Sequence, residues 1–239
     1  MKSIFRISAI ALLAVAPAVA AAQEKTGIRE GFDLKPGTAR ILLLEPSVRV
    51  GAQSTGGMFE PNADWTKQAR ENIERELGRF QGRLGNEVVR LEFDGSPQTV
   101  PLQKYHALFG AVAGSVIEYQ FFPGNRLPTK KRDKSFNWTV GPNVKDLAAL
   151  NGFDYILLIR TKDAYGSTGR KLLQVAAMLG GIGVTSGEHT GYAGLIDVKT
   201  GNLVWLNADV QMGGDVRDPI GAEKRVRQLL EGFPGSDPK

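Results

Sequence analysis

Apolar residues follow one another without interruption from Tyr155 to Ile159, within the segment from Asn151 to Asp163. Gly152 precedes this run and charged residues follow it. A short run of this kind, rich in aromatic and β-branched residues, is typical of a strand that is buried on both faces. We predict that it forms the middle strand of a sheet, with amphipathic helices packed on it and a hairpin after it.

The spacing of apolar and polar residues predicts the elements around this strand. Apolar residues recur every four positions from Trp65 to Leu77, which predicts a helix capped by Asp64. Apolar and polar residues alternate from Glu87 to Phe93, as in a strand. The other predicted strands are Arg40–Glu45, Tyr192–Asp197 and Asn202–Met212, the last two joined as a hairpin. The other predicted helices are Leu102–Tyr119, Val144–Leu150, Arg170–Leu179 and one that starts at Pro219 and buries Ile220, Val226 and Leu229 or Leu230.

These elements together predict an α/β fold with a single domain over residues 39–234. We expect a mixed sheet of about five strands with helices packed on it. Residues 23–38 are predicted to be a flexible lead-in, and residues 235–239 a tail. Val48–Asn62 and Phe121–Pro142 are rich in glycine, proline and polar residues and are predicted to be loops.

The first residues have the pattern of a secretory signal peptide. Lys2 and Arg6 precede an apolar stretch, Ile7–Val19, that ends in small residues. The stretch is shorter than the roughly 20 residues of a membrane-spanning helix. We therefore predict a signal peptide over residues 1–22, with cleavage after Ala20 or Ala22 fitting equally well, and a periplasmic location. The chain has no cysteine, so we expect neither a disulfide nor a lipoprotein.

The charge of the chain argues against nucleic-acid binding. The formal net charge is +5, and removing Lys2 and Arg6 leaves +3. This is a mildly basic balance without the clustered charge of a nucleic-acid-binding protein.

Residues of catalytic type are few and do not form a known pattern. His106 lies within a predicted helix and is interpreted as a surface or core residue, and His189 stands next to Glu188 in a predicted loop. No nucleophile motif and no phosphate-loop or dinucleotide motif of the correct spacing is present. We therefore predict no catalytic site, no metal and no cofactor. The alternative is a hydrolase or metal-dependent enzyme that combines His189 with carboxylates at strand ends, from the set Asp154, Asp163, Asp197, Asp209 and Asp215.

Two segments are candidates for binding. The first is a basic stretch of the predicted loop, where cations beside aromatic residues suit anionic lipid, glycan or an acidic partner. Its residues are Arg126, Lys130, Lys131, Arg132 and Lys134, followed by Phe136 and Trp138. A solvated loop with Trp138 packed against the domain is the alternative.

The second candidate is Arg170–Val184, a helix capped by Ser167 or Thr168 and a glycine-rich segment after it. Its second half is almost wholly apolar and includes Leu172, Leu173 and Met178. An apolar helix packs on the sheet by default, but surplus apolar surface often marks an interface with a partner. Both interpretations stay open at this point.

The order of elements resembles the amino-terminal domain of TolB and related envelope lipoproteins such as CsgG, LpoB and the GNA-type proteins of Neisseria. The residues that carry this resemblance are the strands at 41–46 and 153–160 and the hairpin at 197–205. Segments 45–50, 56–70, 127–141 and 214–222 also resemble a set of uncharacterised exported proteobacterial proteins. The resemblance implies accessory and assembly proteins of the envelope. Without a cysteine, lipid anchoring is not implied for this chain.

From these observations we expect a non-catalytic periplasmic envelope protein, an accessory or assembly factor that acts by protein–protein binding. The expected partner is another envelope protein or a second copy of the chain, with peripheral contact to anionic lipid or glycan through the basic loop. Fold-level analogy is weak support for function, so the residues themselves have to carry the argument.

Overall fold

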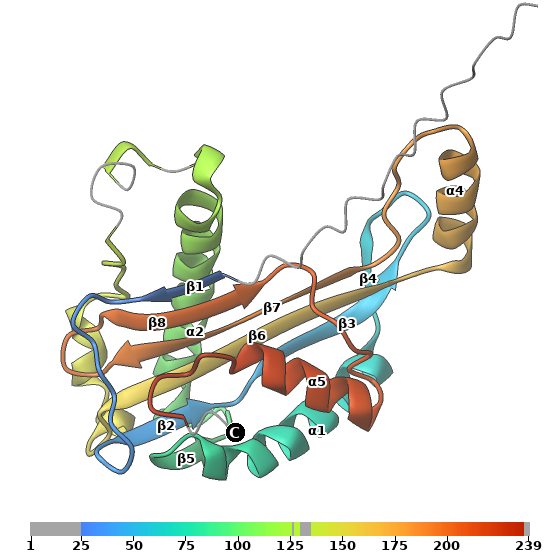
Figure 1. Cartoon of the computed structure of the whole chain (residues 1–239). Helices are drawn as coiled ribbons and strands as arrows, with labels where there is room; N and C mark the ends of the chain where they lie inside the picture. Colours follow the sequence, from blue (N-terminus) through green and yellow to red (C-terminus); the bar gives the residue numbers. More distant parts are fainter. Residues whose placement is uncertain (1–24, 126, 130–134, 237–239) are drawn as a thin grey trace, which may run out of the picture.

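The computed structural model describes residues 25–125, 127–129 and 135–236. The predicted signal peptide lies outside the described residues. Within them, eight strands form one mixed sheet with helices on both faces (Figure 1). The predicted α/β class with a mixed sheet is thus confirmed, although the sheet is larger than the expected five or so strands. No helix among the described residues has the length and apolar character needed to cross a membrane.

The predicted central strand is confirmed as β6 (Tyr155–Gly166). One edge of its first half pairs in parallel with β2 (Arg40–Leu44), and the same edge of its second half pairs in parallel with β3 (Ser47–Gln53). On its other side β7 (Glu188–Asp197) runs antiparallel along most of its length. The long strand therefore joins two parts of the sheet that different strands build.

The remaining strands extend the sheet on both sides. The order is β1-β8-β7-β6-β2-β5, and β3 pairs with β4 as well as with β6. The predicted hairpin of β7 and β8 is confirmed. The bounds of these strands are Lys25–Ile28 for β1, Phe59–Pro61 for β4, Glu87–Leu91 for β5 and Leu203–Asp209 for β8.

Three strands were not predicted. β1 lies in the segment predicted to be a flexible lead-in, and it pairs antiparallel with β8 from Lys25 opposite Ala208 to Ile28 opposite Trp205. An edge strand needs only backbone hydrogen bonds on one side, so it carries no apolar run that a sequence pattern would reveal. β3 and β4 lie in the predicted loop Val48–Asn62, where the prediction was wrong because the glycines outweighed the alternation of buried Val48 and Val50 with polar neighbours.

Two apolar cores lie on opposite faces of the sheet. α1 (Ala63–Phe80) and α5 (Pro219–Leu229) cover one face, and α2 (Thr99–Val116) crosses the other (Figure 1). Alternate residues of β6 enter the two cores, Leu157 and Ile159 on the side of α1 and α5, and Ile156 and Leu158 on the side of α2. This double burial explains why the strand is apolar without interruption.

Local details of the helices differ from the predictions. Asn62 rather than Asp64 caps α1, because its side-chain oxygen accepts a hydrogen bond of 2.9 Å from the Trp65 backbone. Ile220 is 80% exposed, so its predicted burial is wrong, whereas Val226, Leu229 and Leu230 are buried. Short helical turns replace the predicted helix Val144–Leu150 and occur elsewhere, at Gln81–Arg83, Ile117–Phe121, Pro123–Asn125, Pro142–Asp146 and Ala148–Leu150.

Candidate interaction surface

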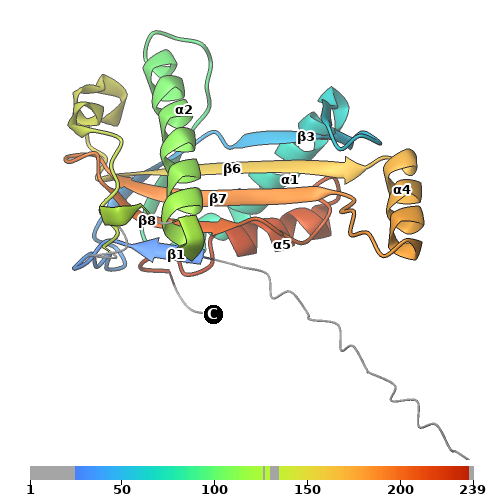
Figure 2. The same cartoon turned by 90° about the horizontal axis from the view of Figure 1, so that it is seen from above.

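The helix α4 (Thr168–Leu179) stands at the end of the sheet where β6 finishes, beyond the helices that cover the two cores (Figure 2). Ser167 is its cap, with the hydroxyl accepting a hydrogen bond of 3.2 Å from the Arg170 backbone. The Arg170 side chain donates to the carbonyl oxygens of Thr185 at 2.9 Å and Thr55 at 3.2 Å. The first turn of α4 is therefore fixed to the tip of the β3–β4 hairpin and to the chain that returns to β7.

One side of α4 faces this support. Arg170, Gln174 and Ala177, spaced three or four residues apart, are the half-buried positions of the middle of the helix. Gly169 approaches the Thr55 hydroxyl so closely that a Cβ would lie 2.4 Å from it. Beneath the helix is an open depression of about 630 Å³ lined by Gln53, Gln174 and His189, among others. The contact of α4 with the domain is thus narrow and polar.

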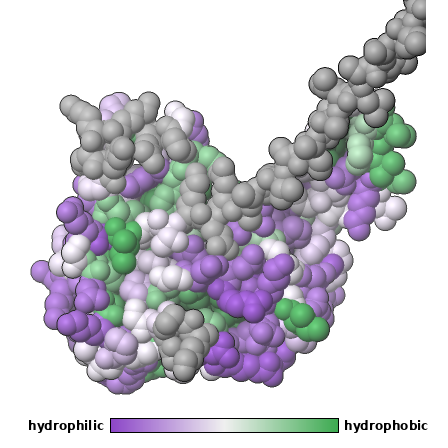
Figure 3. Space-filling model, in the orientation of Figure 1, coloured by the Kyte–Doolittle hydropathy of each residue, from purple (hydrophilic) through white to green (hydrophobic). Residues whose placement is uncertain are grey.

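The opposite side of α4 is apolar and faces solvent. Leu172, Val175, Met178 and Leu179 are 66%, 56%, 64% and 88% exposed, and Ile182 after the helix is 63% exposed. We call these five residues the α4 stripe. None of the residues of α4 is buried, and Figure 3 shows apolar surface at this end of the molecule. A surface helix normally turns its apolar stripe toward the core, so α4 has the reverse orientation.

The structure therefore decides one of the alternatives left open by the sequence. Leu172, Leu173 and Met178 are all exposed, so burial in the core of the single chain is wrong for α4. Their role in binding a partner stays a prediction.

The basic loop falls largely outside the described residues. This applies to Arg126, Lys130, Lys131, Arg132 and Lys134, so their proposed contact with lipid or glycan stays a prediction. Trp138 is described and packs on the core beneath α2. Its indole nitrogen donates to the Gln120 side chain, and its carbonyl oxygen accepts from the Leu203 backbone at 3.0 Å. Trp138 thus lies against the domain, as in the alternative interpretation of the loop, and its role in binding a partner stays a prediction.

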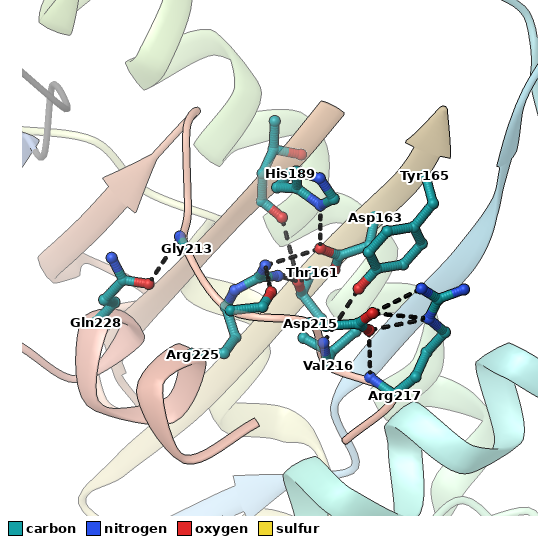
Figure 4. Close-up of polar contacts among 12 residues, drawn as sticks. Thr161, Asp163, Tyr165, His189, Gly213, Asp215, Val216, Arg217, Arg225 and Gln228 are labelled. Carbon is teal, nitrogen blue, oxygen red and sulfur yellow. Dashed lines mark hydrogen bonds and ion pairs between the residues drawn. The ribbon is translucent and has the colours of Figure 1, made fainter. Parts of the chain in front are cut away.

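The candidate catalytic residues Asp163 and His189 do come together, in a buried polar cluster (Figure 4). Asp163 and Arg225 are both 0% exposed and form a two-pronged ion pair with two distances of 2.7 Å. His189 Nδ1 lies 2.8 Å from the same carboxylate, and Arg225 also donates to the Thr161 hydroxyl at 2.5 Å. The cluster joins β6 and β7 to α5.

The environment of Asp163 keeps it ionised. Burial raises the pKa of Asp163, but the hydrogen bonds from His189 and Arg225 outweigh this effect and hold the pKa below its ordinary value. Beside it, burial raises the pKa of Asp215 while the Arg217 guanidinium lowers it, with a net result of about 2. Arg217 lies over the ring of Tyr165 with its Cζ 3.7 Å from the ring centroid. These contacts hold the chain before α5 against the end of the sheet.

Among the described residues, the enzymatic alternative finds His189 paired with Asp163 but no metal-ligand group. Glu188 and His189 both line the depression beneath α4, but the Glu188 carboxylate pairs with Lys162 at 3.0 Å. Both oxygens of Asp163 are engaged by Arg225 and His189, so the carboxylate has no free edge with which to activate water. Asp197 pairs in register with Tyr155 at the far end of β6, next to Asp154 and far along the strand from Asp163. Across the described residues, no group of three His, Cys, Asp or Glu side chains could hold a metal ion.

His106 is a core residue of α2, in agreement with the simpler interpretation of the sequence. It is 7% exposed, and burial, followed by the charge of Arg160, lowers its pKa to about 4. It is therefore neutral at neutral pH.

Sequence reasoning missed Arg225. The signal was its place among the buried positions Ala222, Val226 and Leu229 of α5, where an arginine falls on the face that packs against the sheet. A cation there requires a buried partner, but the sequence does not say which carboxylate supplies it.

No protein-family model and no curated protein matches the chain. Among solved structures, the chain is similar to PelC from Paraburkholderia phytofirmans, described as a dodecamer in two crystal forms. The first has 12% identity and a TM-score of 0.39, and covers 90% of this chain and 99% of PelC. The second has 10% identity and a TM-score of 0.35, and covers 88% and 98%. At TM-scores this low the assembly of PelC is not transferred to this chain, and the resemblance to TolB, CsgG and LpoB stays a prediction.

Proposed function

We propose that this protein is a non-catalytic periplasmic envelope protein, an accessory or assembly factor that acts by protein–protein binding, and that its α4 stripe binds a second copy of the same chain. The observation that carries the proposal is the orientation of α4. Its polar side meets the domain and its apolar side meets solvent, which costs free energy in a monomer and is relieved when the stripe is covered.

The size of the stripe favours a second copy of the chain as the partner. Complete burial of one such side chain contributes about 1.5–3 kcal/mol. The five side chains are roughly two-thirds exposed, so covering one stripe contributes on the order of 5–10 kcal/mol. Association itself costs about 4–15 kcal/mol. One stripe on a polar surface therefore roughly balances this cost, whereas two stripes covering each other contribute twice as much, on the order of 10–20 kcal/mol, and exceed most of that range.

The charges of α4 favour an antiparallel pairing of the two copies. The helix has no acidic residue, and Lys171 in its first turn is exposed. A cation near the amino terminus of a helix is unfavourable, because that end carries the positive partial charge. In an antiparallel pair each Lys171 lies beside the carboxyl end of the partner helix, where a cation is stabilising. The contact is then the same on both copies, as in two-fold symmetric dimers.

The test is the solution mass of the mature protein, measured by light scattering over a range of concentrations. We compare it with a variant that carries Leu172→Gln, Met178→Gln and Leu179→Gln. These side chains are exposed, so the variant is expected to fold, which circular dichroism checks. The control is Ile220→Gln, which replaces an apolar side chain that is 80% exposed on α5. We expect a dimer or larger assembly for the native chain and the control, and a folded monomer for the stripe variant.

Three results would contradict the proposal. If the native protein is monomeric at every concentration, the stripe does not mediate self-association. A stripe variant that keeps the native mass shows that the copies meet elsewhere. Sedimentation of native monomer with lipid vesicles would assign the stripe to a membrane surface instead and would also overturn self-association.

The proposed periplasmic location is tested by a separate measurement. When the full chain is expressed in a Gram-negative host, we expect it in the periplasmic fraction, with a mass that corresponds to cleavage after Ala20 or Ala22. Full-length protein retained in the cytoplasm would contradict export.

A further inference from the structure

Part of the sheet face that α2 covers has no helix on it. α2 packs over the first half of β6, where Ile156 and Leu158 are buried. Further along the same face the next two side chains of β6 are Arg160 and Lys162. Seen from above, β3, β6 and β7 continue from beneath α2 toward α4 (Figure 2). The residue types change from apolar to basic where the cover of α2 ends.

The strand register gathers cations on this uncovered part. Arg160 stands between Ser47 of β3 and Tyr192 of β7, and in the next row Lys162 stands between Arg49 and Thr190. Arg49 and Lys162 are register partners in the parallel pair of β3 and β6, so two side chains of like charge stand side by side on this face.

The side chains of both rows line one small pocket of about 150 Å³. Arg49 and Lys162 are held over the ring of Phe59, at 5.3 Å and 5.2 Å from its centroid. Lys162 is also paired with Glu188, which is not among the residues that line the pocket. Two aromatic contacts and an ion pair therefore fix the positions of these cations on a rigid sheet.

Arg160 is the least satisfied member of this group. None of the other described residues forms a hydrogen bond or an ion pair with its guanidinium. The side chain extends beneath α2 at Gly110, where a Cβ would lie 1.7 Å from Nη1. The absence of a side chain at Gly110 therefore leaves room for this guanidinium beneath α2.

We propose that this pocket is a binding site for a phosphate-class dianion, held by Arg49, Arg160 and Lys162. We call it the β3–β6–β7 anion site. It lies on a different part of the surface from the α4 stripe, and it goes beyond the proposed function and does not depend on it.

The composition of the pocket favours a phosphate group over a carboxylate. Three cations less the charge of Glu188 leave a net charge of +2, which matches a dianion better than a single carboxylate. Guanidinium groups donate two parallel hydrogen bonds that fit the oxygens of phosphate. The hydroxyl groups of Ser47, Thr190 and Tyr192 line the same pocket and supply further donors. The ligand is either free phosphate or a phosphate monoester carried on a larger molecule such as a lipid.

The test is calorimetric titration of the mature protein with inorganic phosphate and with glycerol 3-phosphate, at constant ionic strength set with chloride. Constant ionic strength matters because salt screens exposed charges. We expect saturable binding of one dianion per chain. Arg160→Gln and Arg49→Gln should each weaken it at least about tenfold, because each removes a charge-assisted contact. Arg160→Lys keeps the charge but loses the paired donors, and should lie between Arg160→Gln and the native chain.

The matched control is Arg227→Gln, which removes the same charge from α5 on the opposite face of the sheet, in a second pocket that Glu76 and Glu223 also line. It should bind phosphate as the native chain does. A parallel arm measures sedimentation with phosphatidylcholine vesicles that contain phosphatidic acid. Binding to these vesicles that is much tighter than to glycerol 3-phosphate, and is lost in Arg160→Gln, identifies a lipid as the source of the phosphate.

Three results would overturn the proposal. Phosphate that binds no better than chloride indicates a solvated charged surface. Equal losses in Arg160→Gln and Arg227→Gln indicate a general effect of net charge. Unchanged binding in both Arg49→Gln and Arg160→Gln places the anion elsewhere. The thermal unfolding of each variant without ligand confirms that it is folded.

Discussion

The buried histidine of α2 provides a prediction whose size can be worked from the structure. His106 is 7% exposed, packs edge-on against Phe93, and has no hydrogen-bond partner for Nε2 among the described residues. Burial first, and the charge of Arg160 second, lower its pKa from 6.5 to about 4. Between these values the unfolded chain binds a proton that the folded chain does not. The free energy of unfolding therefore rises with pH across this window. Above the window the whole stabilising contribution of the neutral His106 is present.

The expected change follows from this pKa difference. One pKa unit corresponds to about 1.4 kcal/mol. At about pH 5 the unfolded histidine is almost fully protonated and the folded one almost fully neutral, so folding loses about 2 kcal/mol relative to about pH 7.5. The variant His106→Leu has no side chain that binds this proton. Its free energy of unfolding should therefore not show the loss that His106 causes. Other groups titrate in both proteins alike, so the difference between the two proteins isolates His106.

The assay is urea unfolding of the native chain and of His106→Leu at the two pH values and one ionic strength. We expect the native chain to lose about 2 kcal/mol more than the variant between about pH 7.5 and pH 5. NMR titration gives an independent check, since the chain has only two histidines. Equal losses in the two proteins, or a His106 resonance that titrates near pH 6.5, would refute the argument that burial keeps this side chain neutral.

Three further predictions concern the packing of the domain. Arg225→Met should cost about 3–5 kcal/mol in urea unfolding, because it leaves the Asp163 carboxylate buried without its cation, and Asp163→Asn in the same chain should restore part of the loss. If the single and double variants are equally unstable, the ion pair is not the cause. Gly194→Ala should cost about 1–3 kcal/mol, because its Cβ would lie 2.5 Å from Phe109, and no loss would mean that Phe109 moves freely. Asn62→Ala should cost about 1 kcal/mol by loss of the α1 cap, whereas Asn62→Asp should retain it, and equal loss in both would contradict the cap.

The elements that the sequence predicted correctly are those with local signals. β6 is apolar throughout its first half because both of its faces are covered. The β7–β8 hairpin is specified by its turn, where the Thr200 backbone donates to the Asp197 side chain at 2.8 Å and Gly201 has a φ of 71°. Such features depend on residues a few positions apart, so they can be read from the order of residues alone.

The surfaces that carry the proposals depend on contacts between distant residues. The sequence shows that α4 is amphipathic, but its direction is set by the hydrogen bonds of Arg170 with Thr55 and Thr185, which turn the apolar side outward. Without those contacts the same pattern is equally consistent with a core helix.

For the same reason, neither the anion site nor the buried ion pair could be predicted from the sequence. Arg49 and Lys162 are neighbours only because β3 pairs with the second half of β6, and Arg225 meets Asp163 only because α5 packs beneath the same strand. The sequence by itself determined the middle strand, the hairpin and the α/β class, since each follows from local periodicity. The tertiary structure decided which charged side chains meet and which apolar side chains remain in solvent, because strand register and helix orientation arise from packing among segments far apart in the chain.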